Sequence, residues 1–431
     1  MGDYYDHEVE PTRAWVIHPD ITSDRGRRDA QPRLDEAVSL AAALPDIEVL
    51  GAEIVRLPKT HPAALFGKGK IAELKARLQE NEVELVLVDG PVTPVQQRNL
   101  EKEWKVKLLD RTGLILEIFS DRARTREGVL QVEMAALSYQ RTRLVRAWTH
   151  LERQRGGLGF VGGPGETQIE ADRRAIDDHL NRLRKQLARV IKTRELHRAS
   201  RAKIPFPIVA LVGYTNAGKS TFFNTVTGAD VFVKDMLFAT LDPTMRQLKL
   251  ETAHGGDRDI ILSDTVGFIS NLPTQLVAAF RATLEEVLDA DLILHVRDIS
   301  ADETEDQKTD VLKILSDLGI KEDAPIIEVW NKIDKLDDEA RVARLERAEG
   351  REDVFAISAV TGEGVKPLLD AVSAYFEEDK IERDLIVPYS EGKKRAWLFA
   401  EGVVQSEAAN EEGYALKVLW TPRQEKQFRD M

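Results

Sequence analysis

The sequence predicts an α/β protein in which a domain built on a glycine-rich loop follows a small α/β domain and an antiparallel helical hairpin, and precedes a small α+β domain. Three observations indicate this order. An apolar run at 208–212 enters a glycine loop that opens a helix, strand-like and helix-like segments alternate over residues 1–125, and two long stretches with heptad spacing lie between. The 431 residues leave room for about three domains.

The N-terminal α/β domain is predicted over residues 1–125. Its strand-like and helix-like segments follow one another at 14–17, 34–44, 53–57, 70–78, 84–88, 95–104 and 106–109. This rhythm predicts a small parallel sheet with helices between its strands. Residues 66–70 read Phe-Gly-Lys-Gly-Lys and open a helix whose N-terminus suits an anion. A glycine turn that caps the helix without any ligand is the alternative.

The helical hairpin is predicted over residues 126–200. Apolar residues recur at heptad spacing in both halves, which predicts two helices packed antiparallel. They are Leu130, Met134, Leu137, Leu144, Trp148 and Leu151, then Ile169, Ile176, Leu180, Leu183, Leu187 and Val190. Six glycines fall within positions 156–165, more than a turn between helices requires. We expect a tip that conforms to a partner; a disordered tip with no partner is the alternative.

Charge is distributed unevenly along the chain. The formal net charge is −13, yet residues 121–203 carry 19 Lys and Arg against 10 Asp and Glu, while the remainder carries 42 against 64. A positive element between acidic ones suits a partner with a phosphate backbone. A solvated helical surface that is rich in arginine is the alternative.

The domain predicted over residues 201–378 contains a loop of the pattern G-x-x-x-x-G-K-S. Its glycines let the backbone curl so that amide hydrogens point at the phosphates of a nucleotide. Lys219 is expected to span the β- and γ-phosphates as a catalytic residue, and Ser220 to bind Mg²⁺. The predicted nucleotide contacts of the loop are Gly213, Tyr214, Thr215, Asn216, Ala217, Gly218, Lys219, Ser220 and Thr221.

Three further motifs follow strand-like runs. They are Asp264, Thr265, Val266 and Gly267, then Asn331, Lys332, Ile333 and Asp334, then Ser358, Ala359 and Val360. Asp264 is placed to reach Mg²⁺ through water, and the amide of Gly267 to sense the γ-phosphate as part of the catalytic site. Asp334 can accept two hydrogens that guanine presents and adenine lacks, and Ser358 suits a backbone contact with the guanine carbonyl. This order predicts a GTPase rather than a generic ATPase.

A switch segment is predicted between the loop and Asp264. Its nucleotide contacts are expected from Phe238, Ala239, Thr240, Leu241 and Asp242. Thr240 is the candidate that moves onto Mg²⁺ when the γ-phosphate is present, and it is also assigned a catalytic role. Thr244 is the competing threonine, and an ordinary Asp-Pro turn is the structural alternative.

The position after Gly267 holds a phenylalanine. Many GTPases have a glutamine there that orients the attacking water, whereas the Phe268 side chain has no hydrogen-bonding group. We therefore expect slow intrinsic hydrolysis and a partner that completes the site. Asn216 adds the prediction of K⁺ beside the α- and γ-phosphates; a residue that merely braces the loop is the alternative.

Composition indicates the cellular location of the protein and excludes some kinds of structural site. The hydrophobic share of 42% and charged share of 31% are ordinary for a globular protein, and the absence of cysteine excludes a disulfide framework and a thiolate zinc site. Neither the N-terminus nor the uncharged stretch 204–218 resembles a signal peptide or a membrane span. We expect a cytoplasmic protein, monomeric and without an integral membrane segment.

The small α+β domain is predicted over residues 379–431, from strands at 385–387 and 414–420 and a helix at 393–401.

The motifs together resemble the HflX family of GTPases. Inside the GTPase domain they read GYTNAGKS, FATLDPT, DTVGF, NKID and SAVTGEG; outside it the likeness covers LFGKGKIA at 65–72, DRT at 110–112 and GGPGETQIE at 162–170. The resemblance implies a ribosome-associated GTPase that binds the large ribosomal subunit, directs the glycine tip of the hairpin towards rRNA, and in many members separates stalled or idle ribosomes under stress. It also implies ATP binding by the N-terminal domain, which here would rest on Gly67 to Lys70.

Two other functions compete with this one. A large-subunit assembly GTPase would check maturing particles, and a non-ribosomal signalling switch would use the basic hairpin on a protein or an anionic membrane.

Overall fold

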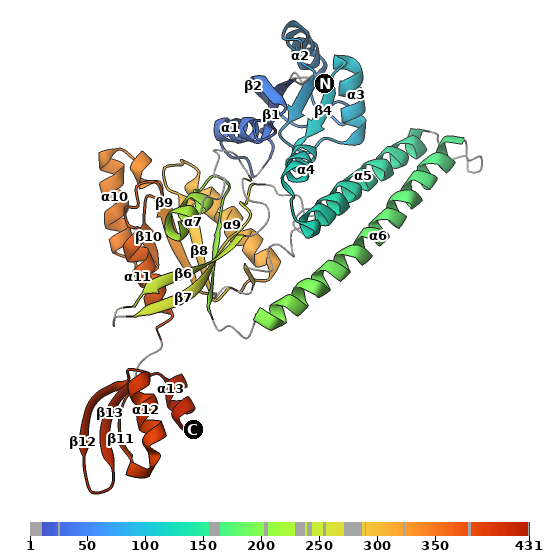
Figure 1. Cartoon of the computed structure of the whole chain (residues 1–431). Coiled ribbons are helices and arrows are strands. Elements are labelled where there is room, and N and C mark those ends of the chain that lie inside the picture. Colours follow the sequence, from blue (N-terminus) through green and yellow to red (C-terminus); the bar gives the residue numbers. More distant parts are fainter. Residues whose placement is uncertain are drawn as a thin grey trace, which may run out of the picture. The chain divides into compact units, whose positions relative to one another are not determined.

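The computed structural model describes residues 11–24, 26–154, 164–201, 206–228, 238, 244–252, 256–270, 287–288, 290–321, 324–377, 381–429 and 431 (Figure 1). Residues 1–249 and 259–366 form one compact unit, and residues 250–258 and 367–431 form a second. Within the described parts of the chain, no helix combines the length and apolar character needed to cross a membrane.

The N-terminal domain is built on a four-stranded parallel sheet of order β2-β1-β3-β4. Its elements are β1 (Thr12–Ile21), α1 (Ala30–Ala41), β2 (Ile47–Leu57), α2 (Lys68–Glu80), β3 (Leu85–Val88), α3 (Pro94–Trp104), β4 (Lys107–Asp110) and α4 (Arg111–Arg122). Side chains alternate between the two faces of a strand. One face of the sheet, including Ala14 and Val16, therefore packs with α1 and α4, and the other, including Ile17, packs with α2 and α3.

Two long helices follow as a hairpin, α5 (Arg126–Gln154) and α6 (Pro164–Arg201), which lie side by side in Figure 1. Of the predicted heptad residues with described side chains, Leu130, Leu180 and Leu183 are buried. The other six are half-buried: Met134, Leu137, Leu144, Ile176, Leu187 and Val190. An ion pair between Arg141 and Asp177, 2.7 Å, also joins the two helices. Of the glycine-rich tip, residues 155–163 lie outside the described residues.

The domain that contains the glycine loop is built on a six-stranded sheet of order β10-β9-β8-β5-β7-β6. Its elements are β5 (Ile208–Gly213), α7 (Lys219–Thr227), β6 (Thr244–Glu251), β7 (Asp257–Asp264), β8 (Leu292–Asp298), α9 (Thr304–Leu318), β9 (Ile326–Asn331), the 3-10 turn η1 (Ile333–Lys335), α10 (Asp338–Glu349), β10 (Val354–Ala356) and α11 (Val365–Tyr375). The pairs that join β7, β5, β8, β9 and β10 are all parallel. The carboxyl ends of these strands therefore share one edge, where ligands bind in such sheets.

The C-terminal part forms an antiparallel sheet of order β11-β13-β12. Its elements are β11 (Ile381–Val387), the 3-10 turn η2 (Tyr389–Glu391), α12 (Gly392–Ala400), β12 (Val404–Ala409), β13 (Tyr414–Trp420) and α13 (Pro422–Arg429). Leu398 of α12 is fully buried against Val418 and Trp420 of β13. The predicted fold class is thus confirmed. The sequence prediction left out α4, β6, β8, α9, α10, α11, β12 and α13.

Candidate nucleotide-binding site

The glycine loop joins the central strand β5 to α7, as the sequence predicts. Gly213 has φ 154° and Gly218 has φ 93°, and an added Cβ would lie 2.1 Å from the backbone oxygen of Val296 or from Nδ2 of Asn331, respectively. These positions therefore exclude any side chain. The loop has the shape needed to cradle phosphates with its amides.

The two functional side chains of the loop are held by short contacts. Lys219 Nζ donates to the backbone oxygens of Gly213, 3.1 Å, and Tyr214, 2.9 Å, so the ammonium is folded back along the loop. Burial lowers the pKa of Lys219 to about 8, although the Asp264 carboxylate opposes this shift. Ser220 Oγ donates to Asp264 Oδ2 at 2.7 Å. The hydroxyl and the carboxylate predicted to serve Mg²⁺ are thus adjacent.

The segment after β7 runs directly beside the loop. Thr215 N donates to Phe268 O, 2.7 Å, and Phe268 N donates to Gly213 O, 3.1 Å. An added Cβ on Gly267 would lie 2.8 Å from Thr215 Cγ2 and 3.1 Å from Lys219 Nζ, which leaves no room for a side chain. Residue 267 can therefore offer its backbone amide close to the Lys219 ammonium.

Two side chains of this segment face away from the predicted nucleotide. Thr265 Oγ1 donates to Leu211 O at 2.5 Å and so holds β7 against β5. Phe268 is only 2% exposed and packs in the apolar cluster with Val266. Position 268 therefore contributes no group that could orient water.

The motif predicted to bind guanine, residues 331–334, holds three loops together. Asn331 Nδ2 donates to Ala217 O, 2.8 Å, and Asn331 Oδ1 accepts from Ala359 N, 2.9 Å. Lys332 Nζ bonds to Asp298 Oδ2 at 2.7 Å, and Lys332 has φ 69°. Asp334 follows on η1 with an exposed side chain, as a base-reading carboxylate requires.

The remaining residues of the guanine site come from two places. Ile333 is fully buried beneath Asp334. Ser358 is also fully buried, and its Oγ accepts from Thr361 N at 3.2 Å, so its hydroxyl shapes the loop. The Val360 side chain is largely exposed. The loop that follows β10 is thus held against the glycine loop through Asn331 and Ala359.

Only part of the predicted switch segment is described. Ala239, Thr240, Leu241 and Asp242 lie outside the described residues, whereas the competing Thr244 is the first residue of β6. Phe238 is described, with φ 58° and a buried side chain that packs against Phe119 of α4. Its ring therefore contacts the N-terminal domain.

The residues present fit Mg²⁺ with a nucleoside triphosphate. Among the described residues, no group of three His, Asp or Glu side chains forms a metal site by itself. Magnesium commonly takes few protein ligands and completes its shell with phosphate and water, which the adjacent Ser220 and Asp264 match. The cradle around Gly218 and Gly267, which admits no Cβ, matches the phosphates.

Comparison with known proteins agrees with this geometry. Four family models match successive parts of the chain: GTP-binding GTPase N-terminal at 31–120, GTP-binding GTPase Middle Region at 122–201, 50S ribosome-binding GTPase at 208–332 and HflX C-terminal domain at 343–429. A protein named GTPase HflX from Magnetococcus marinus is 48% identical over 407 residues, which are 94% of this chain and 91% of that protein. The chain belongs to the HflX family of GTPases.

Other HflX relatives extend the likeness. GTPase HflX of Escherichia coli strain K12 is 41% identical over 414 residues, 96% of this chain and 93% of that protein. The chain is also similar to a crystal structure of a GTP-binding protein from Sulfolobus solfataricus in complex with GDP, with 23% identity, a TM-score of 0.44, and coverage of 84% of this chain and 98% of that one. The family resemblance seen in the motifs is confirmed, and the chain is a GTP hydrolase whose substrate is GTP.

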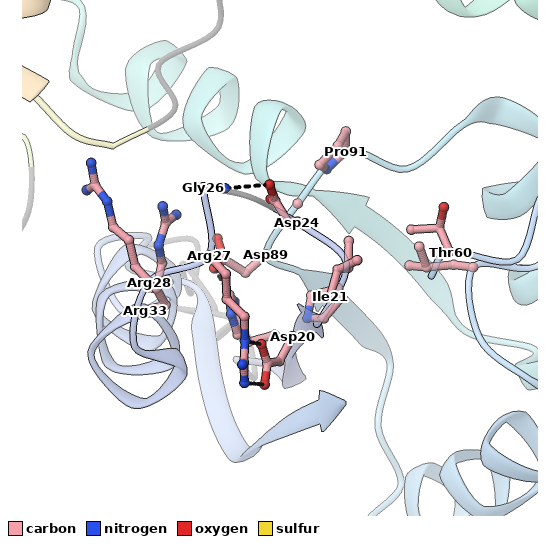
Figure 2. A pocket seen from close by; sticks show the side chains of 14 residues that line it. Asp20, Ile21, Asp24, Gly26, Arg27, Arg28, Arg33, Thr60, Asp89 and Pro91 are labelled. Atoms are coloured by element: carbon pink, nitrogen blue, oxygen red, sulfur yellow. Dashed lines mark hydrogen bonds and ion pairs between the residues drawn. The ribbon is translucent and has the colours of Figure 1, made fainter. Parts of the chain in front are cut away.

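The N-terminal domain of this HflX chain has a cavity of about 150 Å³ at the carboxyl ends of β1 and β3 (Figure 2). The strand order reverses between these two strands, where open α/β sheets often bind ligands. Its charged lining is paired internally: Arg27 forms two bonds to Asp20, 2.6 and 2.7 Å, and His18 Nδ1 lies 2.7 Å from Asp89 Oδ2. The lining combines polar and apolar groups, and these contacts already engage four of its polar side chains.

The glycine turn before α2 lies apart from that cavity. Neither Gly67 nor Lys70 lines it. Lys70 Nζ bonds to Glu53, 3.0 Å, and to Glu73, 2.8 Å. The Lys70 ammonium is therefore engaged by two carboxylates, which matches the reading of this turn as a helix cap.

The sequence reasoning missed one group of residues near the nucleotide. Glu36, Arg111 and Ser270 surround the hydroxyl of Tyr214, although they come from three separate segments. Arg111 directly follows the strand-end residue Asp110, and this Asp-Arg-Thr stretch contributed to the family resemblance. The place of Arg111 after a strand end was therefore a signal in the sequence. The spacing of the motifs, however, did not indicate that Arg111 would contact Glu36 and Ser270.

Proposed function

We propose that this HflX-family GTPase binds the large ribosomal subunit through its basic hairpin, that its GTP-bound form separates stalled or idle ribosomes, and that hydrolysis, accelerated by the ribosome, permits release. The buried Phe268 is the observation that carries the proposal, because the position after Gly267 has no group to orient water. The family model described as a 50S ribosome-binding GTPase, which matches the GTPase domain, supports the choice of partner.

The described site supports a division of labour in hydrolysis. Lys219 would neutralise charge on the β- and γ-phosphates, and the amide of Gly267 would bond to the γ-phosphate. Ser220 would ligate Mg²⁺ directly, with Asp264 acting through water; the ion supplies further charge stabilisation. Asp334 would select guanine, while Asn331 holds the base loop against the phosphate loop. Binding to the ribosome would then either order the catalytic segments or supply the chemical group that orients the attacking water.

The exposed side of α6 supports contact with rRNA. Five cationic side chains and no acidic ones occur between residues 181 and 193, and all five are exposed: Arg182, Arg184, Lys185, Arg189 and Lys192. Such a row suits a phosphate backbone, whose binding falls steeply with salt. The tip at 156–165 would reach further into the subunit.

We expect purified large subunits to raise GTP turnover by more than about tenfold, since partners that complete a GTPase site act by larger factors elsewhere. The triple variant R184E/K185E/R189E should lose this stimulation and bind subunits with a weaker salt dependence, while its turnover in isolation is unchanged. Turnover assays and sedimentation with large subunits measure both effects.

The matched control is K313E/K321E/R347E, which makes the same charge change on exposed residues outside the hairpin and should behave as the unmodified protein.

On sucrose gradients, the protein with a non-hydrolysable GTP analogue should convert 70S particles into subunits. Association with precursor particles alone would instead indicate assembly, and no sedimentation with either at low salt would indicate a non-ribosomal switch.

Potassium binding is proposed at Asn216. The residue stands at the exposed apex of the loop with φ 58°, and no hydrogen bond of its side chain is found among the described residues. This disfavours a purely bracing role. We expect turnover to be faster in K⁺ than in Na⁺ at equal ionic strength and the difference to vanish in Asn216→Ala. Equal rates for the unmodified protein in both salts would remove the cation from the mechanism.

ATP binding at Gly67 to Lys70, a cytoplasmic location and a monomeric state remain predictions from the sequence and the family resemblance.

A further inference from the structure

The side chain of Tyr214, the second residue of the glycine loop, points into the N-terminal domain. Its hydroxyl donates to Glu36 Oε1 of α1 at 2.8 Å and accepts from Ser270 N at 2.7 Å. Tyr214 is 7% exposed, and Ser270 is 3% exposed. Burial and the neighbouring Glu36 carboxylate raise the pKa of Tyr214, so the hydroxyl keeps its proton and remains a donor.

Arg111, the first residue of α4, completes the network. Its Nη2 donates to the backbone oxygen of Ser270, 3.0 Å, and to Ser270 Oγ, 3.1 Å, and also lies 3.1 Å from Glu36 Oε1. Its Nη1 bonds to Asp89 Oδ1 at 2.5 Å. Burial alone would lower the pKa of Arg111, but the Glu36 and Asp89 carboxylates outweigh it and raise that pKa. The guanidinium is charged and 5% exposed, so its bonds form in a low-dielectric site.

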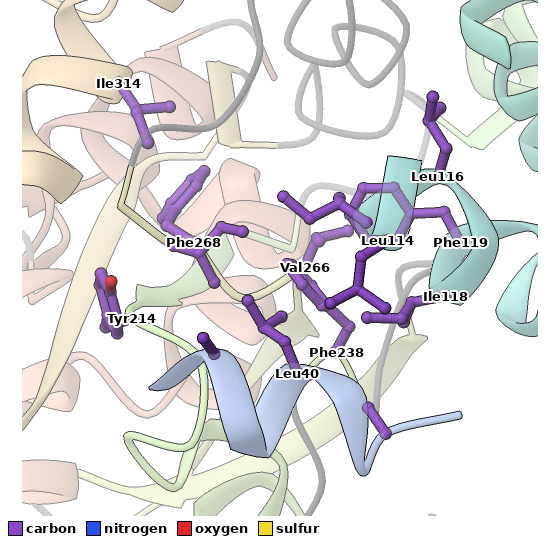
Figure 3. Packing of buried hydrophobic residues seen from close by; sticks show 14 of the residues in the cluster. Leu40, Leu114, Leu116, Ile118, Phe119, Tyr214, Phe238, Val266, Phe268 and Ile314 are labelled. Atoms are coloured by element: carbon purple, nitrogen blue, oxygen red, sulfur yellow. The ribbon is translucent and has the colours of Figure 1, made fainter. Parts of the chain in front are cut away.

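The same helix also touches the switch segment. Phe119, two turns after Arg111, packs edge-on against Phe238 with ring centroids 4.6 Å apart. Figure 3 shows Phe119 and Phe238 together with Val266, which precedes Gly267. Helix α4 therefore contacts both segments that are expected to respond to the γ-phosphate.

The network acts on residue 267 through a short length of backbone. Ser270 lies three residues after Gly267, and Phe268 between them is paired by backbone bonds to the glycine loop. Ser270 is bonded to Tyr214, Glu36 and Arg111, and its Oγ also accepts from Arg33 Nη1 at 3.3 Å. The backbone at Gly267 is thus held close to Lys219 before any γ-phosphate arrives. Such preorganisation lowers the entropy lost on binding the ligand that uses this amide.

We propose that Tyr214, Glu36 and Arg111 are positioning residues that hold the Gly267 segment ready for the γ-phosphate, and so set how strongly the protein prefers GTP over GDP. GDP has no γ-phosphate and gains nothing from this segment. By linkage, GTP in turn stabilises the contact between the glycine loop and the N-terminal domain. The inference concerns nucleotide binding by the protein alone and stands whether or not the ribosomal proposal holds.

The test uses the full chain, Mg²⁺ and two nucleotides, GDP and the imido analogue of GTP, with affinities measured by calorimetry. In Tyr214→Phe we expect the affinity for the GTP analogue to fall by about tenfold, as is typical of coupling between two sites, and the affinity for GDP to change by less than about twofold. Glu36→Gln, which keeps the shape of the side chain, should produce a smaller shift in the same direction. A loss that affects both nucleotides equally would overturn the proposal.

A matched control separates positioning from simple contact between the domains. Arg28, just before α1, forms two bonds of 2.7 Å to Asp310 of α9. Among the described residues, Asp310 forms no hydrogen bond to the glycine loop or to the 264–270 segment. Asp310→Asn should leave the ratio of the two affinities unchanged. Should it alter the ratio as much as Tyr214→Phe, the effect belongs to domain contact in general and the proposed role is wrong. If Tyr214→Phe does not fold, the affinities of Glu36→Gln for GDP and for the GTP analogue decide whether the proposal holds.

Discussion

Replacement of Lys219 by alanine is expected to reduce GTP turnover by at least about a thousandfold, equivalent to about 4 kcal/mol of lost transition-state stabilisation. Lys219 is the buried cation of the loop, and its ammonium lies 3.1 and 2.9 Å from the backbone oxygens of Gly213 and Tyr214. No other side chain from the described loop can neutralise the phosphates, since residues 213–218 carry no charge. Single-turnover hydrolysis and Mg·GTP affinity should both fall.

The Lys219 prediction has a close control. Lys335 on η1 is exposed, and Lys335→Ala removes the same charge without entering the loop. It should retain turnover within about twofold, as for most surface substitutions. If Lys219→Ala kept substantial activity while Lys335→Ala did not, the assignment of the phosphate site to this loop would be wrong.

Asp334→Asn is expected to convert the base preference from guanine to xanthine. The Asp334 carboxylate is exposed on η1, next to the buried Ile333 and the bracing Asn331, so its replacement leaves the surrounding loops in place. A site built to bond to a group rejects a base lacking that group by factors of about 10⁴ to 10⁵, because buried polar groups are left without partners. GTP affinity should fall by at least about a hundredfold, and XTP should become the better ligand.

Competition between GTP and XTP measures this exchange directly. Asp338→Asn, four residues further on in the first turn of α10, is the matched control and should leave base preference unchanged. Unchanged guanine selectivity in Asp334→Asn would contradict the assignment of the base site.

Local patterns in the sequence predicted the elements of the site well. A strand, a glycine loop and a helix at 208–227 depend on residues close in the chain, and the register of β5, β7, β8 and β9 then brings Gly213, Asp264 and Asn331 to one edge. Hydrophobic spacing predicted both hairpin helices for a similar reason. Helix α4 was missed because it starts at Arg111, directly after the last residue of β4, with no loop to mark its beginning.

Local sequence patterns could not predict where individual side chains point. Asn331 and Thr265 lie in motifs that were assigned to the nucleotide, yet their side chains bond to Ala217, Ala359 and Leu211 and so brace the loops around it. Phe238, also assigned to the nucleotide, turns its ring to Phe119. Motif spacing identifies which residues gather at the site but not which of them hold the others in place.

By itself, the sequence determined the family, the GTPase chemistry and the guanine preference, because these follow from residue types at short, fixed spacings. Only the tertiary structure decided that Tyr214 turns from the glycine loop to Glu36, 178 residues away, and that Arg111 holds Ser270 across 159 residues. Contacts of such separation arise when whole domains pack, and they depend on burial and on satisfying every polar group there. No local periodicity encodes them.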